Sequence, residues 1–312
     1  MKKIIICLMI LFLCANSSYT AKALNMNSAF AYQSTDSYDI TMKQDLLCLM
    51  MAYPEYITNI EHKDNGTVYL IMKSGKKVLY DDKKIKNFEQ KLENPDLQDM
   101  MEQKYPLETT NKLMDKNFDP GRFRLYDLLK EVYGGSREQV ESKLKNVNLG
   151  YRSFQFNGNN KAADGLKDAM QEIVPFAQKR QNISSSLFPC SGTFNYRLIS
   201  GTNRLSPHSF GIAIDLARDK RDYWKWASPE EGQKRLDSYP KEIVEVFEKN
   251  NFVWGGKWSH FDILHFEYRP EIILKARYFG NKGNNLDLWY SGVPSEEISA
   301  QDYIKKIDNA LK

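Results

Sequence analysis

Residues 206–216, SPHSFGIAIDL, place a histidine and an aspartate seven positions apart around a glycine. The apolar run that ends at Asp215 predicts a strand. On a flat strand His208 and Asp215 would lie on opposite faces, because side chains alternate along a strand. A turn or bulge near residues 209–211, which Gly211 permits, would bring both side chains together. We interpret the stretch as half of a metal site.

The other half is expected in residues 261–267, FDILHFE. His265 is the predicted third ligand, and Asp262 lies three positions before it. Metal-assisted hydrolysis needs this combination, because the metal lowers the pKa of bound water and a carboxylate takes its proton. Glu267 shares a strand face with His265 and is expected to orient it through a hydrogen bond. His260 is the alternative to His265 as a ligand.

Apolar patterning around these stretches predicts an α+β fold. Helical spacing indicates helices at residues 122–133, 140–147, 166–177 and 230–250, and from about residue 299 to the end. Strand, glycine turn and strand again are predicted across residues 252–270. Because the helices come first and the short strands follow, we expect a small antiparallel sheet that carries the motifs.

The region before this domain has strand-like alternation but no chemical motif. Residues 56–81 alternate apolar and polar side chains and are broken at Asn65-Gly66, which predicts a small β-meander. His62 is expected on its surface. We therefore predict a region of unknown role over residues 24–110 and a domain that carries the site over residues 111–312. A wall-targeting or regulatory role for the first region stays open.

The chain begins with Met-Lys-Lys and an apolar run of about a dozen residues, too short for a comfortable membrane span. The small-x-small pattern Ala21-Lys22-Ala23 follows, so residues 1–23 are interpreted as a secretory signal. This predicts a secreted or cell-envelope protein without stable membrane insertion after signal removal. An uncleaved membrane anchor is one alternative. A lipidated Cys14 is another, although Leu13 is bulky for a lipoprotein cut.

Charge and cysteine content narrow the function classes. Residues 1–23 hold three lysines and no acid, so the 44 basic residues become 41 against 40 acidic ones. Such a balance provides no strong field for nucleic acid, and we expect no nucleic-acid partner. Only Cys48 and Cys190 then remain. They are interpreted as buried thiols, although a disulfide between them and a catalytic Cys190 stay open.

Taken together, the motifs resemble one family of zinc peptidases. The combination of SxHxxGxAxD, WGGxW and DxxHFE is similar to zinc D-alanyl-D-alanine carboxypeptidases and L-alanyl-D-glutamate endopeptidases of peptidoglycan. Their fold is shared with the Hedgehog signalling domain. The resemblance spans roughly residues 120–280. It rests on Ser206, His208, Gly211, Ala213, Asp215, Trp254, Gly255, Gly256, Trp258, Asp262, His265 and Glu267.

The resemblance implies site residues and a cofactor. Zinc would be held by His208, Asp215 and His265, although such ligands also suit other first-row ions. Asp262 would be the general base. Carboxypeptidase branches typically have Glu at that position, so the Asp favours the endopeptidase branch, which includes phage endolysins.

The family also has an arginine that polarises the scissile carbonyl group. Arg197, after Tyr196, fits this pattern better than Arg204. Aromatic residues near the motifs are expected in the core or along a peptide groove, and they are Tyr223, Trp224, Trp226, Trp254 and Trp258.

The sequence thus predicts a secreted zinc-dependent peptidase that hydrolyses amide bonds in peptidoglycan stem peptides. An L-alanyl-D-glutamate endopeptidase is favoured. A D-alanyl-D-alanine carboxypeptidase and a non-catalytic, zinc-stabilised wall-binding module are the alternatives.

Overall fold

The computed structural model describes residues 37–280 and 288–312, so the predicted signal at residues 1–23 lies outside the described residues. The chain divides into two compact units, residues 1–44 and 45–312. Of the first unit, residues 37–44 are described, and they are helical. Within the described ranges, no helix combines the length and the apolar character that a membrane span requires.

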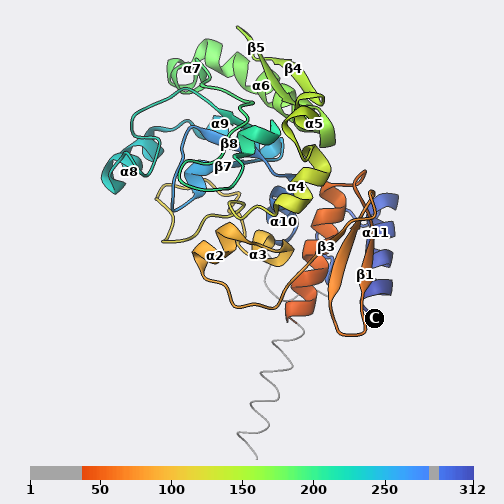
Figure 1. The fold of residues 1–312 in the computed structure, drawn as a ribbon. Helices are drawn as coiled ribbons and strands as arrows, with labels where there is room; N and C mark the ends of the chain where they lie inside the picture. Colours follow the sequence, from red (N-terminus) through yellow and green to blue (C-terminus); the bar gives the residue numbers. More distant parts are fainter. Residues whose placement is uncertain (1–36, 281–287) are drawn as a thin grey trace, which may run out of the picture. The chain divides into compact units, whose positions relative to one another are not determined.

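The second unit begins with a helix that runs to Ala52, and the predicted β-meander follows it and is confirmed. Its antiparallel strands are β1 (Ile57–His62), β2 (Val68–Met72) and β3 (Lys77–Leu79). Gly66 makes the first turn with a φ of 80°, a conformation that glycine adopts readily. The C-terminal helix α11 (Ile298–Ala310) lies along β1, where the Lys306 Nζ donates to the Thr58 carbonyl at 3.2 Å (Figure 1). His62 is exposed, as expected.

Helices dominate the middle of the chain. They are α2 (Phe88–Glu93), α3 (Leu97–Met101), α4 (Tyr126–Tyr133), α5 (Arg137–Glu141), α6 (Ala162–Lys179) and α7 (Gln181–Leu187). The prediction of a helix over residues 140–147 is wrong. Helix α5 ends at Glu141, and a hairpin of β4 (Leu144–Asn148) and β5 (Ser153–Asn157) follows. Gly150, with a φ of 95°, lets the chain turn back and pair with itself there.

A separate, three-stranded antiparallel sheet carries the motifs, as predicted. Its strands β6 (Ala213–Asp215), β8 (His265–Tyr268) and β7 (Phe252–Trp254) lie in that order. Fully buried Phe247 and Phe266 pack with ring centroids 4.4 Å apart between this sheet and α9 (Lys241–Lys249). Helix α10 (Pro270–Phe279) also packs against β7, and α8 (Pro229–Ser238) precedes α9 along the chain. The α+β class is therefore confirmed.

Buried polar pairs link the N-terminal part of this unit to α10. The Lys275 Nζ lies 2.5 Å from the Asp45 Oδ1, and the Tyr53 hydroxyl donates to the Glu271 Oε2 at 2.7 Å. Residues 45–110 therefore belong to the same compact unit as the site. A separate role for residues 24–110 stays a prediction.

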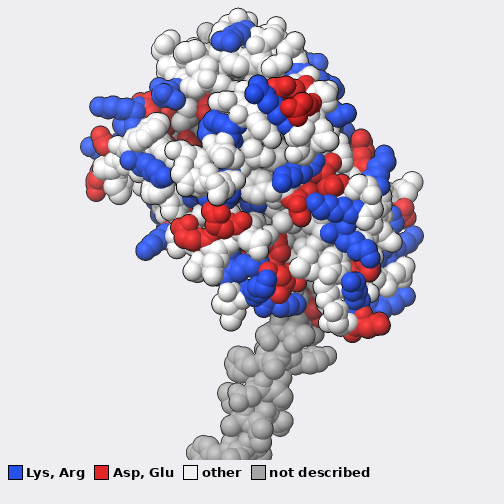
Figure 2. Space-filling view, viewed as in Figure 1, with Lys and Arg blue, Asp and Glu red and all other residues white. Residues whose placement is uncertain are grey.

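The surface charges are mixed. Figure 2 shows Lys and Arg side chains interspersed with Asp and Glu over the face that it draws. This distribution fits the 44 basic and 40 acidic residues of the sequence.

Candidate active site

A tight turn positions His208. Ser206 precedes the short 3-10 helix of residues Pro207–Phe210, and its Oγ accepts a hydrogen bond from the His208 backbone N–H at 3.3 Å. Gly211 ends the turn with a φ of 67°. A Cβ atom there would lie 2.8 Å from the Leu144 Cδ2, so both the conformation and the space favour glycine. This is the turn that the sequence predicted between His208 and the strand.

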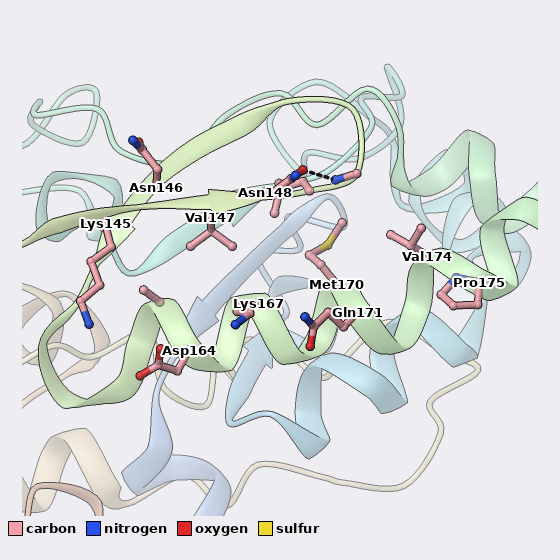
Figure 3. A pocket seen from close by; sticks show the side chains of 13 residues that line it. Lys145, Asn146, Val147, Asn148, Asp164, Lys167, Met170, Gln171, Val174 and Pro175 are labelled. Atoms are coloured by element: carbon pink, nitrogen blue, oxygen red, sulfur yellow. Dashed lines mark hydrogen bonds between the residues drawn. The ribbon is translucent and has the colours of Figure 1, made fainter.

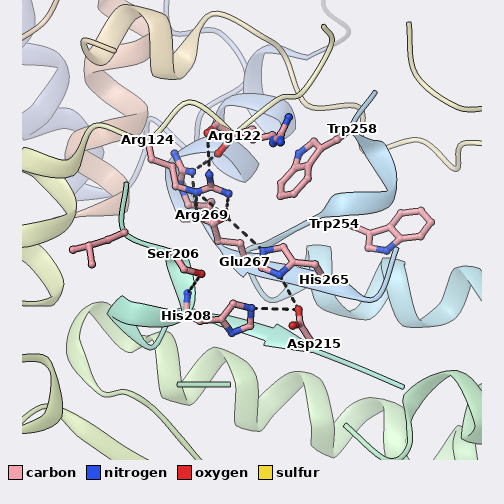
Figure 4. Close-up of polar contacts among 12 residues, drawn as sticks. Arg122, Arg124, Ser206, His208, Asp215, Trp254, Trp258, His265, Glu267 and Arg269 are labelled. Carbon is pink, nitrogen blue, oxygen red and sulfur yellow. Dashed lines mark hydrogen bonds and ion pairs between the residues drawn. The ribbon is translucent and has the colours of Figure 1, made fainter. Parts of the chain in front are cut away.

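The three predicted ligands converge on one point (Figure 4). Asp215 and His265 are direct partners across β6 and β8, and the His265 Nδ1 lies 2.9 Å from the Asp215 Oδ1. The His208 Nε2 lies 3.3 Å from the same oxygen. One donor atom from each residue falls within 4.8 Å of the others. Both histidine residues are 5 % exposed, so the cluster is formed where water has limited access.

A hydrogen bond on the outer side of His208 and a nearby carboxylate on the outer side of His265 decide which ring nitrogen faces the cluster. The His208 Nδ1 lies 2.5 Å from the Thr193 carbonyl oxygen, which can only accept, so Nδ1 donates to it and Nε2 is the ring nitrogen that faces the cluster. The His265 Nε2 lies 3.9 Å from the Glu267 Oε2, and its Nδ1 faces Asp215. Two imidazole nitrogens and one carboxylate oxygen form a donor set that suits zinc, with room for a fourth ligand.

The ionisable side chains of the cluster shift one another's pKa values. Burial alone would raise the pKa of Asp215, but the charge of His208 and hydrogen bonds from both imidazoles hold it well below its usual range. Burial would lower the pKa of His265, yet the hydrogen bond to Asp215 and the nearby carboxylate of Glu267 raise it to about 10. Because a metal ligand must be deprotonated, metal binding here would release a proton.

Asp262 lies in the same cavity as the cluster and is half-buried. Its backbone N–H donates to the Gly255 carbonyl at 3.0 Å, and its carbonyl accepts from the His265 N–H at 3.0 Å, so the segment is held in place. Burial raises the pKa of Asp262 to about 6. A carboxyl group with a pKa near neutrality is suited to accept and return a proton.

The cavity of about 280 Å³ collects most of the other predicted residues. Its lining includes His208, Asp215, Asp262, His265, Arg197, His260, Tyr223, Trp226 and Trp258. Arg197 is exposed. Trp224 and Trp254 are absent from the lining among the described residues, and so is Arg204, whose Nε lies 3.2 Å from the Glu93 Oε1. His260 is not part of the described His208–Asp215–His265 cluster.

A buried charge network that was not predicted from the sequence lies behind His265. Glu267 is fully buried, and the Arg124 Nε and Nη2 donate to its two oxygens at 2.6–3.0 Å. The Arg269 Nη1 lies 3.3 Å from the Glu267 Oε1 (Figure 4), and the Arg269 Nε donates to the Glu271 Oε1 at 2.6 Å. The charge of Arg124 is the main reason why the pKa of Glu267 stays well below its usual range despite burial. The alternating charges of E-Y-R-P-E after His265 were the signal for it.

Removing Arg124 should therefore destabilise the fold. Arg124→Ala leaves Glu267 buried with only part of its pairing, and breaking a buried pair on one side lowers the free energy of unfolding by about 3–5 kcal/mol. Chemical denaturation of the purified variant measures it. Arg137→Ala, which breaks an exposed pair with Glu141, is the matched control and should change little. Equal losses in both variants would contradict the role given to Arg124.

Cys48 and Cys190 are free and buried, so the disulfide between them is not formed. Burial raises the pKa of the Cys190 thiol to about 11. Because the thiolate is the nucleophile, a thiol that stays protonated is inert. The structure therefore favours the interpretation of both residues as packing thiols.

A larger hollow, of about 520 Å³, lies between the β4–β5 hairpin and α6 (Figure 3). Its lining mixes Lys145, Asn146, Lys167 and Gln171 with apolar side chains such as Met170. No metal-ligand cluster of the described residues falls within it. The smaller cavity, which contains the His208–Asp215–His265 cluster, is therefore the better candidate for the active site.

Comparison with known proteins supports this choice of site. Residues 200–268 match the D-alanyl-D-alanine carboxypeptidase family. The matched segment covers less than a quarter of the chain. It contains the three clustered residues and Asp262, whereas Arg197 and Arg124 lie outside it. Peptidases of this family are in general zinc-dependent.

A curated relative matches over part of its length. Over 67 residues, the chain is 37% identical to the peptidoglycan L-alanyl-D-glutamate endopeptidase CwlK of Bacillus subtilis (strain 168). The aligned region is 21% of this chain and spans 40% of that peptidase. No solved structure matches the chain.

Proposed function

We propose that this protein is a secreted zinc-dependent peptidase that hydrolyses amide bonds in peptidoglycan stem peptides. The observation that carries the proposal is the convergence of His208, Asp215 and His265 in one cavity with Asp262. The family match of the same segment supports it. The aspartate at position 262 and the similarity to an L-alanyl-D-glutamate endopeptidase favour that bond as the target. We propose a fold of the Hedgehog and D-alanyl-D-alanine peptidase type for the domain.

The site residues divide the chemistry of amide hydrolysis among them. His208, Asp215 and His265 would hold zinc, which when bound activates water and polarises a carbonyl group. Asp262 would take the proton from the attacking water and later give it to the leaving amine. Arg197 would donate a hydrogen bond to the carbonyl oxygen as negative charge develops on it.

Digestion of muropeptides by the zinc-loaded protein, followed by mass spectrometry, tests this function. Release of a whole stem fragment after L-alanine is expected for the endopeptidase. Loss of a single alanine would identify a carboxypeptidase instead. Binding to sacculi without any released peptide would contradict catalysis and would favour the wall-binding module.

The role of Arg197 has its own expected result. Arg197→Ala should lower kcat/KM by about a hundredfold, because removal of one donor to a developing oxyanion has an effect of this order. Bound zinc should not change. Arg204→Ala is the control, since Arg204 pairs with Glu93 away from the cavity lining, and it should keep the activity of the wild type. A similar loss in both variants would point to a general effect of surface charge.

A further inference from the structure

His260 lines the cavity, but the proposed mechanism gives it no role. Its ring is held firmly. The His260 Nδ1 lies 2.6 Å from the Asp119 Oδ2 and 3.1 Å from the Ser259 Oγ. Phe88 stacks on the ring at 5.2 Å between centroids, and Trp224 contacts it edge-on at 4.6 Å. These contacts fix the orientation of the His260 ring in the cavity wall.

Asp119 sets which nitrogen of this ring is free. Its side chain is fully buried and also accepts hydrogen bonds from the Arg122 Nη1 at 2.6 Å and the His260 backbone N–H at 3.0 Å. Burial would raise the pKa of Asp119, but Arg122 and these hydrogen bonds hold it below its usual value. An ionised carboxylate only accepts, so the His260 Nδ1 must donate to it.

The Nε2 atom of His260 is then the free end of the ring. Among the described residues it has no hydrogen-bond partner, and the side chain is 21 % exposed. In a neutral ring whose Nδ1 carries the proton, Nε2 is an acceptor. His260 and Asp262 both line the cavity and are two positions apart, with the buried side chain of Phe261 between them.

We propose that His260 is a substrate-binding residue whose Nε2 accepts a hydrogen bond from a backbone N–H of the bound peptide, with Asp119 as its positioning residue. The proposal rests on the proposed function of this cavity. A peptide placed with its scissile bond beside Asp262 would have the neighbouring peptide unit beside His260. The pocket would thereby select a stem peptide with a free N–H group at that position.

Two substitutions separate substrate binding from structural support. In His260→Asn, the side-chain amide can replace Nδ1 and keep the bond to Asp119, but nothing replaces Nε2. In His260→Gln, the longer side chain can place an acceptor near the position of Nε2 but can no longer donate a hydrogen bond to Asp119. We expect His260→Asn to raise KM about tenfold, the effect of one lost hydrogen bond, with kcat, zinc content and melting temperature close to wild type.

We expect His260→Gln to show the opposite behaviour, with KM within about twofold of wild type and a lower melting temperature. His62→Asn is the matched control at an exposed histidine and should change neither quantity. A wild-type KM in His260→Asn, or equal rises in KM for both His260 variants, would overturn the proposal.

The failure of the proposed function would look different, because the wild type itself would then release no peptide. Titration calorimetry of stem-peptide binding to the wild type and the two His260 variants still decides the role of His260 in that case. Binding weakened about tenfold in His260→Asn alone supports the proposal. Equal binding by wild type and His260→Asn overturns it.

Discussion

The double variant His208→Ala/His265→Ala should contain no bound zinc, whereas the wild type should contain about one zinc ion per chain. The substitutions remove both imidazole nitrogens of the cluster and leave Asp215 as its single ligand, which is too few to hold the ion. Peptide release should fall to background in the same variant. Elemental mass spectrometry of protein purified without chelators measures the metal, and muropeptide digestion measures the activity.

His62→Ala is the control for this experiment, because His62 is exposed and lies outside the described cluster. It should keep both the zinc and the activity. A freshly purified wild type without metal would contradict the zinc site. The peptidase and the zinc-stabilised module would then fail together, and residues 206–216 would be explained by packing alone.

The second large effect is a loss of kcat, which we expect when Asp262 is replaced. Asp262→Asn has nearly the same shape but cannot accept a proton, so kcat should fall by about 10²- to 10⁴-fold. Zinc content should remain that of the wild type, because Asp262 is not part of the described His208–Asp215–His265 cluster. Steady-state kinetics on a purified stem peptide and metal analysis of the same preparation provide the two readouts.

Asp219→Asn is the matched control for this variant. Asp219 also lines the cavity, but its carboxylate is engaged by Arg221, whose Nη2 lies 2.7 Å away. We expect it to keep kcat within a few-fold of wild type. Undiminished cleavage by Asp262→Asn with full zinc would remove Asp262 from the proton transfer.

Sequence patterns predicted the local structure correctly where the conformation of a few neighbouring residues determines it. The Asn-Gly turn of the β-meander and the Ser-Pro turn before His208 were predictable because backbone conformations of this kind restrict which residues fit. The structure of the segment after Glu141 was not predictable in this way. Apolar residues at 140, 144 and 147 fit a helix, but the turn at Gly150 allowed a hairpin, whose strand pairing satisfies the backbone instead.

The sequence by itself determined the α+β class and the choice of His208, Asp215, Asp262 and His265, because these residues lie in two short motifs with a recognisable spacing. Only the tertiary structure decided what surrounds them. Arg124 reaches Glu267 across 143 positions of the chain, and Asp119 reaches His260 across 141. Burial makes such pairs strong, since an unpaired charge is costly away from water. No local pattern records which distant carboxylate and which distant cation will meet, because that depends on how the whole unit packs.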